Sequence, residues 1–201
     1  MVWFRHFPSL VLATGLVVTL AAEGASAQDV DAVAYFQKAR QASGEGLAKK
    51  TKLVDVRPAK PGEVVVTIIK GEGKETQSAP ASAGDKVVRN RCAATGNEEI
   101  LVKAATLARR YEGPVAAADA SGWRAYRPRG NPMKFVVVAE SDGTFSFKAP
   151  WGEQMIARPG DMIVQDPSRP RDTYRIAKAA FDCTYEILRQ PQPKSNSRPR
   201  Q

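Results

Sequence analysis

The chain contains an internal repeat, and a repeat of this length restricts the fold to two copies of one small unit. Segments near the start of the first copy recur seventy positions later, and segments near its end recur at a slightly larger spacing. The matches keep the same order along the chain, which predicts a duplicated unit. They are Val56-Arg57-Pro58 with Tyr126-Arg127-Pro128, Gly84-Asp85-Lys86-Val87-Val88 with Gly160-Asp161-Met162-Ile163-Val164, and Tyr111-Glu112 with Tyr185-Glu186.

Each copy has the pattern of a small antiparallel sheet followed by a helix. Residues 63–69 and 134–140 are rich in β-branched side chains, which is typical of strands. A glycine-containing turn follows each run, at 71–73 and at 141–143, so each run is expected to open a hairpin. Further strands and a short helix complete each copy. The sequence therefore predicts an α+β fold, made of two tandem units that are each closed by a C-terminal helix.

The domain boundaries follow from the repeat. A helix is expected over 29–42, with Asp29 or Asp31 near its positive end. Each repeated unit has only about sixty residues, which is marginal for an independent core, so the two are expected to pack together around a pseudo-twofold axis. The predicted organisation is an N-terminal helix and linker at 28–51, a first unit at 52–114, a linker at 115–122, a second unit at 123–188 and a disordered basic tail at 189–201.

The first 27 residues have the three parts of a secretory signal peptide. Arg5 is basic, residues 10–22 are apolar and uncharged, and Ala25-Ser26-Ala27 offers the small residues that signal peptidase requires. Cleavage is expected before Gln28. The alternative is an uncleaved anchor, although the apolar run is shorter than the roughly 20 residues of a membrane-spanning helix. The mature protein is therefore expected in the periplasm or outside the cell, without a transmembrane segment.

The net charge of +9 has two interpretations. A basic exported protein is attracted to anionic surfaces such as phosphorylated lipids or acidic glycans. Alternatively, the charge only maintains solubility. Neither interpretation predicts specific recognition of a nucleic acid, and the possible partners are an anionic envelope surface or another periplasmic protein. Four of the basic residues counted in this charge lie in the tail, namely Arg189, Lys194, Arg198 and Arg200.

The only cysteines are Cys92 and Cys183, which permit one intramolecular pairing. Export to an oxidising compartment favours a disulfide. Two buried or reactive thiols are the alternative.

The only histidine is His6, inside the predicted signal peptide. The mature chain therefore lacks Ser-His-Asp and Cys-His nucleophilic sites, histidine bases and histidine-ligated metals. No catalytic residue, metal ligand or cofactor is predicted. A glycan-acting hydrolase using carboxylates is the alternative. Its candidate acids occupy equivalent positions in the two copies, where a turn or surface role is also expected: Asp85 with Asp161, and Glu112 with Glu186.

The clearest candidate for a binding surface is an insert in the second copy. It carries Trp151, Glu153 and Met155. An extra loop with such side chains is a reasonable binding site, although Trp151 can equally fill the seam between the units. Arg57 and Arg127, at matching positions, are a second candidate, because they can form a shared basic patch. An ordinary salt bridge or surface position for each is the alternative.

The turn Pro159-Gly160-Asp161 and the ending Phe181-Asp182-Cys183-Thr184-Tyr185-Glu186 resemble the small bacterial and phage family named for its PGDYG motif. The resemblance covers 159–186, with a weaker echo over 83–112. It departs from the motif at Met162 and Ile163, where the family has Tyr and Gly. The family carries no assigned activity, so the resemblance implies a fold unit and not a function. Taken together, the sequence predicts an exported, non-enzymatic binding or structural protein of unknown ligand.

Overall fold

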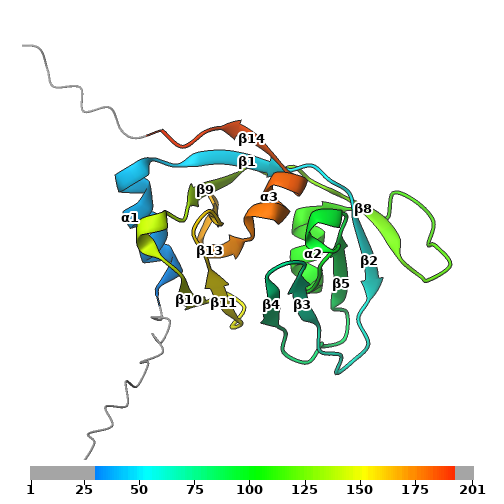
Figure 1. Ribbon diagram of the computed structural model, residues 1–201. Helices are drawn as coiled ribbons and strands as arrows, with labels where there is room; N and C mark the ends of the chain where they lie inside the picture. Colours follow the sequence, from blue (N-terminus) through cyan, green and yellow to red (C-terminus); the bar gives the residue numbers. More distant parts are fainter. Residues whose placement is uncertain (1–29, 193–201) are drawn as a thin grey trace, which may run out of the picture.

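The computed structural model describes residues 30–192, and the predicted signal peptide and most of the basic tail lie outside this range. The fold is mixed, with antiparallel sheets and short helices, in agreement with the predicted class (Figure 1). The first five-stranded sheet contains, in order, β6 (Glu99–Val102), β5 (Lys86–Asn90), β2 (Val54–Pro58), β8 (Arg124–Pro128) and β7 (Tyr111–Glu112). The second contains β13 (Arg169–Ile176), β12 (Met162–Asp166), β9 (Met133–Val137), β1 (Gly46–Lys50) and β14 (Tyr185–Arg189).

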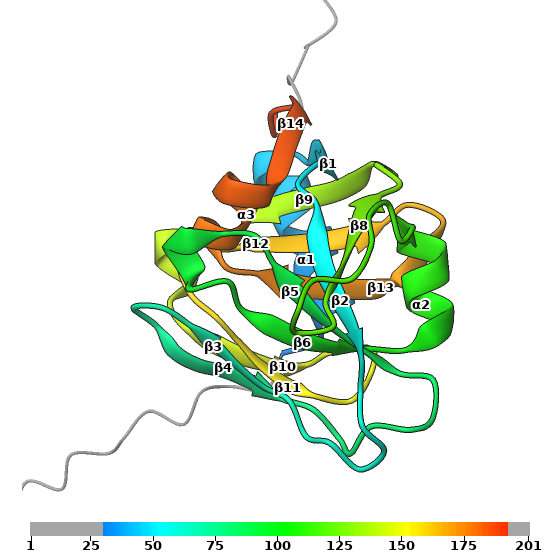
Figure 2. The same ribbon diagram turned by 90° about the vertical axis from the view of Figure 1, so that its right-hand side faces the viewer.

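Two short ribbons and the helices complete the structure. The ribbons lie side by side along one edge of the molecule (Figures 1 and 2). They are β3 (Val66–Ile69) with β4 (Gly73–Gln77), and β10 (Phe145–Lys148) with β11 (Gln154–Ala157). The helices are α1 (Ala32–Ser43), α2 (Ala104–Arg110) and α3 (Lys178–Thr184), with single 3-10 turns η1 (Ala93–Thr95) and η2 (Glu140–Asp142). The predicted N-terminal helix is confirmed, and Asp31 caps it by accepting a hydrogen bond from the Ala34 amide at 2.7 Å.

The chain passes between the two sheets twice. Strand β1 pairs with β9 and β14, whereas the next strand, β2, belongs to the other sheet. Strand β8 pairs with β2 and β7, and its successor β9 again belongs to the other sheet. The first half of the chain therefore supplies β1 to the sheet formed mostly by the second half, and the second half supplies β8 to the sheet formed mostly by the first half.

The predicted helix and linker at 28–51 need correction at their end, because residues 46–50 form strand β1. The strand carries small residues where Phe135 packs over it: a Cβ atom on Gly46 would lie 2.2 Å from the Phe135 ring. Without large apolar side chains in alternation, the segment lacks the usual sequence signal of a strand.

Two further expectations need correction. The turn at 141–143 does not open a hairpin from β9, because β9 pairs with β12 and β1, and η2 leads instead to β10. The matched segments 56–58 and 126–128 lie on β2 and β8, which are paired neighbours in one sheet. Both differences have one cause. The strand that takes the central position of β2 in the second sheet is β9, and β8 instead pairs with β2 in the first sheet. In addition, Arg189, the first residue of the predicted tail, ends β14 opposite Leu47.

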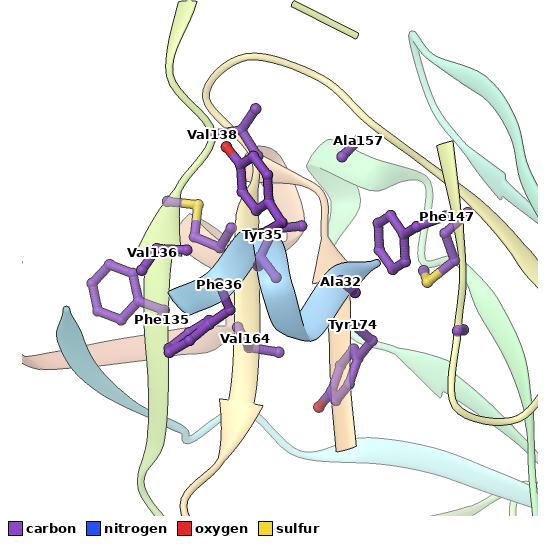
Figure 3. Packing of buried hydrophobic residues seen from close by; sticks show 14 of the residues in the cluster. Ala32, Tyr35, Phe36, Phe135, Val136, Val138, Phe147, Ala157, Val164 and Tyr174 are labelled. Carbon is purple, nitrogen blue, oxygen red and sulfur yellow. The ribbon is translucent and has the colours of Figure 1, made fainter. Parts of the chain in front are cut away.

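The larger core lies between α1 and the second sheet (Figure 3). Phe36, Phe135 and Phe147 are almost completely buried there. A smaller core, containing Val54, Val88 and Leu107, supports the first sheet. Burial of these side chains provides most of the favourable free energy of folding.

A buried ion network ties the β3–β4 ribbon to the second sheet. The Arg175 side chain is fully buried and donates to Asp161 at 2.8 Å, to Glu72 at 2.6 Å and to Glu75 at 2.5 Å. Burial raises the pKa of Glu75, although Arg175 opposes the shift. The predicted disulfide is also present and joins Cys92, beside η1, to Cys183 in α3 across a Cα–Cα distance of 6.0 Å.

Replacing Arg175 with Met is expected to lower the free energy of unfolding by about 3–5 kcal/mol, because the buried carboxylates lose their counter-ion. The pKa of Glu75, which burial raises and Arg175 opposes, then rises further in the folded state, so the loss should be smaller at pH 5 than at pH 7. Urea unfolding at both pH values measures this. Arg158→Met is the control: Arg158 touches the same Glu72 from a partly exposed position, and its loss should cost less than about 1 kcal/mol. Equal losses of unfolding free energy in the two variants would contradict the role of Arg175 as the counter-ion of the buried carboxylates.

Replacing both cysteines with serine is expected to lower the free energy of unfolding by about 4 kcal/mol, since the disulfide closes a loop of 91 residues. Urea unfolding of the double variant and of the oxidised wild-type chain measures the change, and the reduced wild-type chain is a control that should match the double variant. A difference of less than about 1 kcal/mol between the double variant and the oxidised wild-type chain would show that the disulfide does not restrain the unfolded chain.

Candidate functional site

The C-terminal end of α2 gathers arginine side chains. Arg109 and Arg110 are its last residues, and Arg129 reaches it from the segment after β8. The Arg129 amide donates to the Arg110 carbonyl at 2.9 Å, and its Nε donates to the Ala108 carbonyl at 3.2 Å. Helix carbonyls at this end lack partners within the helix and carry partial negative charge, so a guanidinium stabilises them.

Asp172 on β13 neutralises only part of this charge. One carboxylate oxygen accepts from Arg109 at 3.2 Å and from Arg110 at 2.7 Å. Arg110 also donates to the Tyr174 hydroxyl at 2.8 Å, and its guanidinium lies 5.0 Å from the centre of the Tyr174 ring. Burial tends to lower the pKa of Arg110, but Tyr174 and Asp172 outweigh it and raise that pKa, so the side chain stays charged.

The first residues of β13, directly after the turn from β12, add two more arginines. Arg169 and Arg171 are exposed, and neither forms an ion pair with any residue that the structure describes. Asp166, opposite Arg169, accepts hydrogen bonds from Ser168. Burial tends to raise the pKa of Asp166, but these hydrogen bonds, together with Arg110 and Arg109, lower it. This effect shows that the turn lies within the electrostatic field of the α2 end.

These residues form one surface, which we call the arginine face. Five arginines outnumber two aspartates on it, which leaves an excess of three positive charges. Guanidinium groups recognise phosphate, sulfate and carboxylate groups by paired hydrogen bonds. The arginine face consists of Arg109, Arg110, Arg129, Arg169 and Arg171 with Asp166 and Asp172.

Trp151 lies beside the arginine face. The residue is 46% exposed, and its ring contacts the Tyr174 ring edge-on, at 5.5 Å between centres. Because Tyr174 also contacts Arg110, one buried tyrosine joins the exposed tryptophan to the arginines. The other residues of the predicted insert have different roles. Glu153 accepts a hydrogen bond from Thr76 at 2.7 Å and links the two ribbons, and Met155 is buried in the larger core.

Arg57 and Arg127 do not form a shared patch. They lie on paired strands, but the antiparallel register places them four positions apart, or about 14 Å. Arg57 forms an ion pair with Glu63 at 2.6 Å and lies over the Trp123 ring at 5.2 Å. Arg127 forms an ion pair with Glu112 at 3.2 Å.

The candidate acids of a hydrolase are each held by a cation. Asp85 accepts from Lys103 at 2.7 Å and Asp161 from Arg175 at 2.8 Å. Each aspartate also accepts an amide hydrogen bond from the residue three positions before it. Glu186 contacts Lys49 at 3.2 Å, and Glu112 contacts Arg127 as described above. All four therefore occupy turn or ion-pair positions.

Within residues 30–192, no group of three or more His, Cys, Asp or Glu side chains is arranged to hold a metal ion. No helix in this range is long and apolar enough to cross a membrane.

Comparison with protein-family models, with curated proteins and with solved structures gives no match. The resemblance to the PGDYG-motif family therefore stays an expectation from the motif alone.

Asp172→Asn is expected to strengthen binding to anionic vesicles about fivefold, because it frees Arg109 and Arg110 from their shared carboxylate. Vesicle co-sedimentation at low salt measures the affinity. Asp182→Asn makes the same change of charge on α3, where Asp182 forms an exposed pair with Lys178, and should have a smaller effect. Equal effects of the two variants would mean that only net charge matters.

Proposed function

We propose that this chain is an exported, non-enzymatic protein that binds anionic surfaces of the cell envelope through the arginine face. The observation that carries the proposal is the pair Arg169 and Arg171, exposed and without counter-ions among the described residues, beside the charged end of α2. Support for export comes from the predicted signal peptide at residues 1–27. The net charge of +9 adds a long-range attraction to the same partners.

A binding role is favoured over a carboxylate-dependent hydrolase. The general acid of such an enzyme needs a raised pKa, and its partner needs an open position near the substrate. The pKa of Asp85 is lowered: burial tends to raise it, but the Lys103 and Ser82 hydrogen bonds outweigh the burial. Asp161 is buried and bound to Arg175, and so is unsuited to touch a glycan.

We further propose that the two halves are interlocked copies of one unit. The support is that the two five-stranded sheets have corresponding strand orders, each with one strand from the other half. The ion pairs Lys49–Glu186 and Arg127–Glu112, both at 3.2 Å, join corresponding strands in the two sheets. In this arrangement the arginine face is a departure from symmetry, because α3 ends in Asp182-Cys183-Thr184 where α2 ends in Ala108-Arg109-Arg110.

The double variant Arg169→Ala/Arg171→Ala is expected to bind anionic vesicles about 30-fold more weakly, since each basic residue near such a surface contributes about 1 kcal/mol. Co-sedimentation with phosphatidylglycerol vesicles measures the loss, which should shrink as salt is raised. The matched control is Lys70→Ala/Lys74→Ala, which removes the same charge from the β3–β4 ribbon, away from α2 (Figure 2).

Both double variants should be repeated in a chain that ends at residue 192, because the basic tail is itself attracted to anions. In this shorter chain, the double arginine variant should still bind vesicles more weakly than the double lysine variant. Equal weakening by the two double variants would contradict a localised binding face.

A further inference from the structure

The tip of the β10–β11 ribbon is a tight turn that presents apolar side chains. The Gly152 amide donates to the Ala149 carbonyl at 2.8 Å, and the Ala149 amide donates to the Glu153 carbonyl at 2.8 Å. Pro150 and Trp151, the two central residues of the turn, are both exposed. Gly152 adopts a φ of +96°, which an L side chain rarely tolerates. The backbone therefore fixes the direction in which Pro150 and Trp151 project.

Trp151 is held in place although it is exposed. Its ring contacts Tyr174, which is itself buried and bonded to Arg110. By contrast, Trp123 is only 8% exposed and lies under Arg57 and Arg89. An apolar ring held at the surface leaves apolar area in water, and covering that area with an apolar partner is favourable.

We propose that Trp151 is an interfacial anchor, which enters the headgroup region of an anionic bilayer while the arginine face binds the lipid phosphates. This inference rests on the proposed function and names the lipid surface as its partner. Tryptophan favours the boundary between water and hydrocarbon, because its ring is apolar and its indole N–H is polar. Arginines next to it supply the attraction to anionic headgroups.

The apolar tip distinguishes a lipid surface from a soluble polyanion. A sulfated or phosphorylated polymer satisfies the arginines but offers no apolar phase for Pro150 and Trp151. A bilayer satisfies both. A polymer partner is thus an outcome that the experiment must be able to detect.

The test uses the chain from Gln28, in which Trp123 and Trp151 are the only tryptophans. In a Trp123→Phe variant, Trp151 alone reports on its surroundings by fluorescence. Vesicles containing phosphatidylglycerol should shift its emission to shorter wavelength, and brominated lipids should quench it. Vesicles of phosphatidylcholine alone should do neither at physiological salt. Heparin should bind without producing the shift.

A second variant does not depend on replacing Trp123. Trp151→Ala in the otherwise unchanged chain should weaken binding to phosphatidylglycerol vesicles about tenfold, from the loss of a partly buried ring, and should leave heparin binding unchanged. The control is Ile68→Ala, which removes an apolar side chain that is 51% exposed on β3 and should leave vesicle binding unchanged.

The outcomes separate this inference from the proposed function. Vesicle binding without a fluorescence shift, together with an unaffected Trp151→Ala variant, would overturn the anchor and leave the arginine face standing. Tight heparin binding with no vesicle binding would identify a soluble polyanion as the partner and would also overturn the anchor. Failure to bind either probe would contradict the proposed function itself.

Discussion

The exchange of β1 and β8 between the two sheets is the constraint on which the other contacts depend. Because each of these strands pairs on both sides within the sheet of the other half, neither sheet is complete without both halves. The exchange also brings Lys50, at the end of β1, to about 6 Å from the ring centres of Tyr111 and Tyr185, which follow the two short helices. The disulfide and the ion pairs of Arg175 with Glu72 and Glu75 then join the same halves at other places. The chain therefore has one interlocked body, and separate unfolding of either half would break paired strands in both sheets.

This body explains how the arginine face is assembled. Its arginines come from α2, from the segment after β8 and from β13, which the exchange places side by side. Strand β8 pairs with β7 directly after α2, so Arg129 meets the carbonyls at the end of that helix. Asp172 on β13 then bonds both arginines of α2 and fixes the second sheet against the first. The same contacts that hold the halves together therefore position the proposed binding surface.

Local features could be predicted from the sequence, and features that depend on distant pairing could not. The Gly-Asp turns at 84–85 and 160–161 were predictable because each aspartate bonds an amide three residues earlier, within its own turn. The α1 cap at Asp31 is local in the same sense. The role of residues 46–50 depends on Phe135, nearly ninety positions later, and no periodicity in the segment itself reveals it.

The arginine face cannot be predicted for the same reason, since its members are spread over sixty positions and no local segment holds all of them. Trp151 was identified because it interrupts the match between the two copies. Met155, from the same insert, faces the core because it is the second residue of β11, and strand residues alternate between the two faces. A signal such as Arg109-Arg110 beside a helix end indicates a basic surface only once its neighbours in space are known.

The most direct test of the account is the reactivity of individual arginines toward phenylglyoxal, measured by mass spectrometry with and without phosphatidylglycerol vesicles. If the arginine face binds the bilayer, vesicles should protect Arg169, Arg171 and Arg129, while Arg91, which is 44% exposed beside Asp55, should react at an unchanged rate. Uniform protection of all exposed arginines, or protection centred on Arg91, would contradict the claim that this surface is where the protein binds.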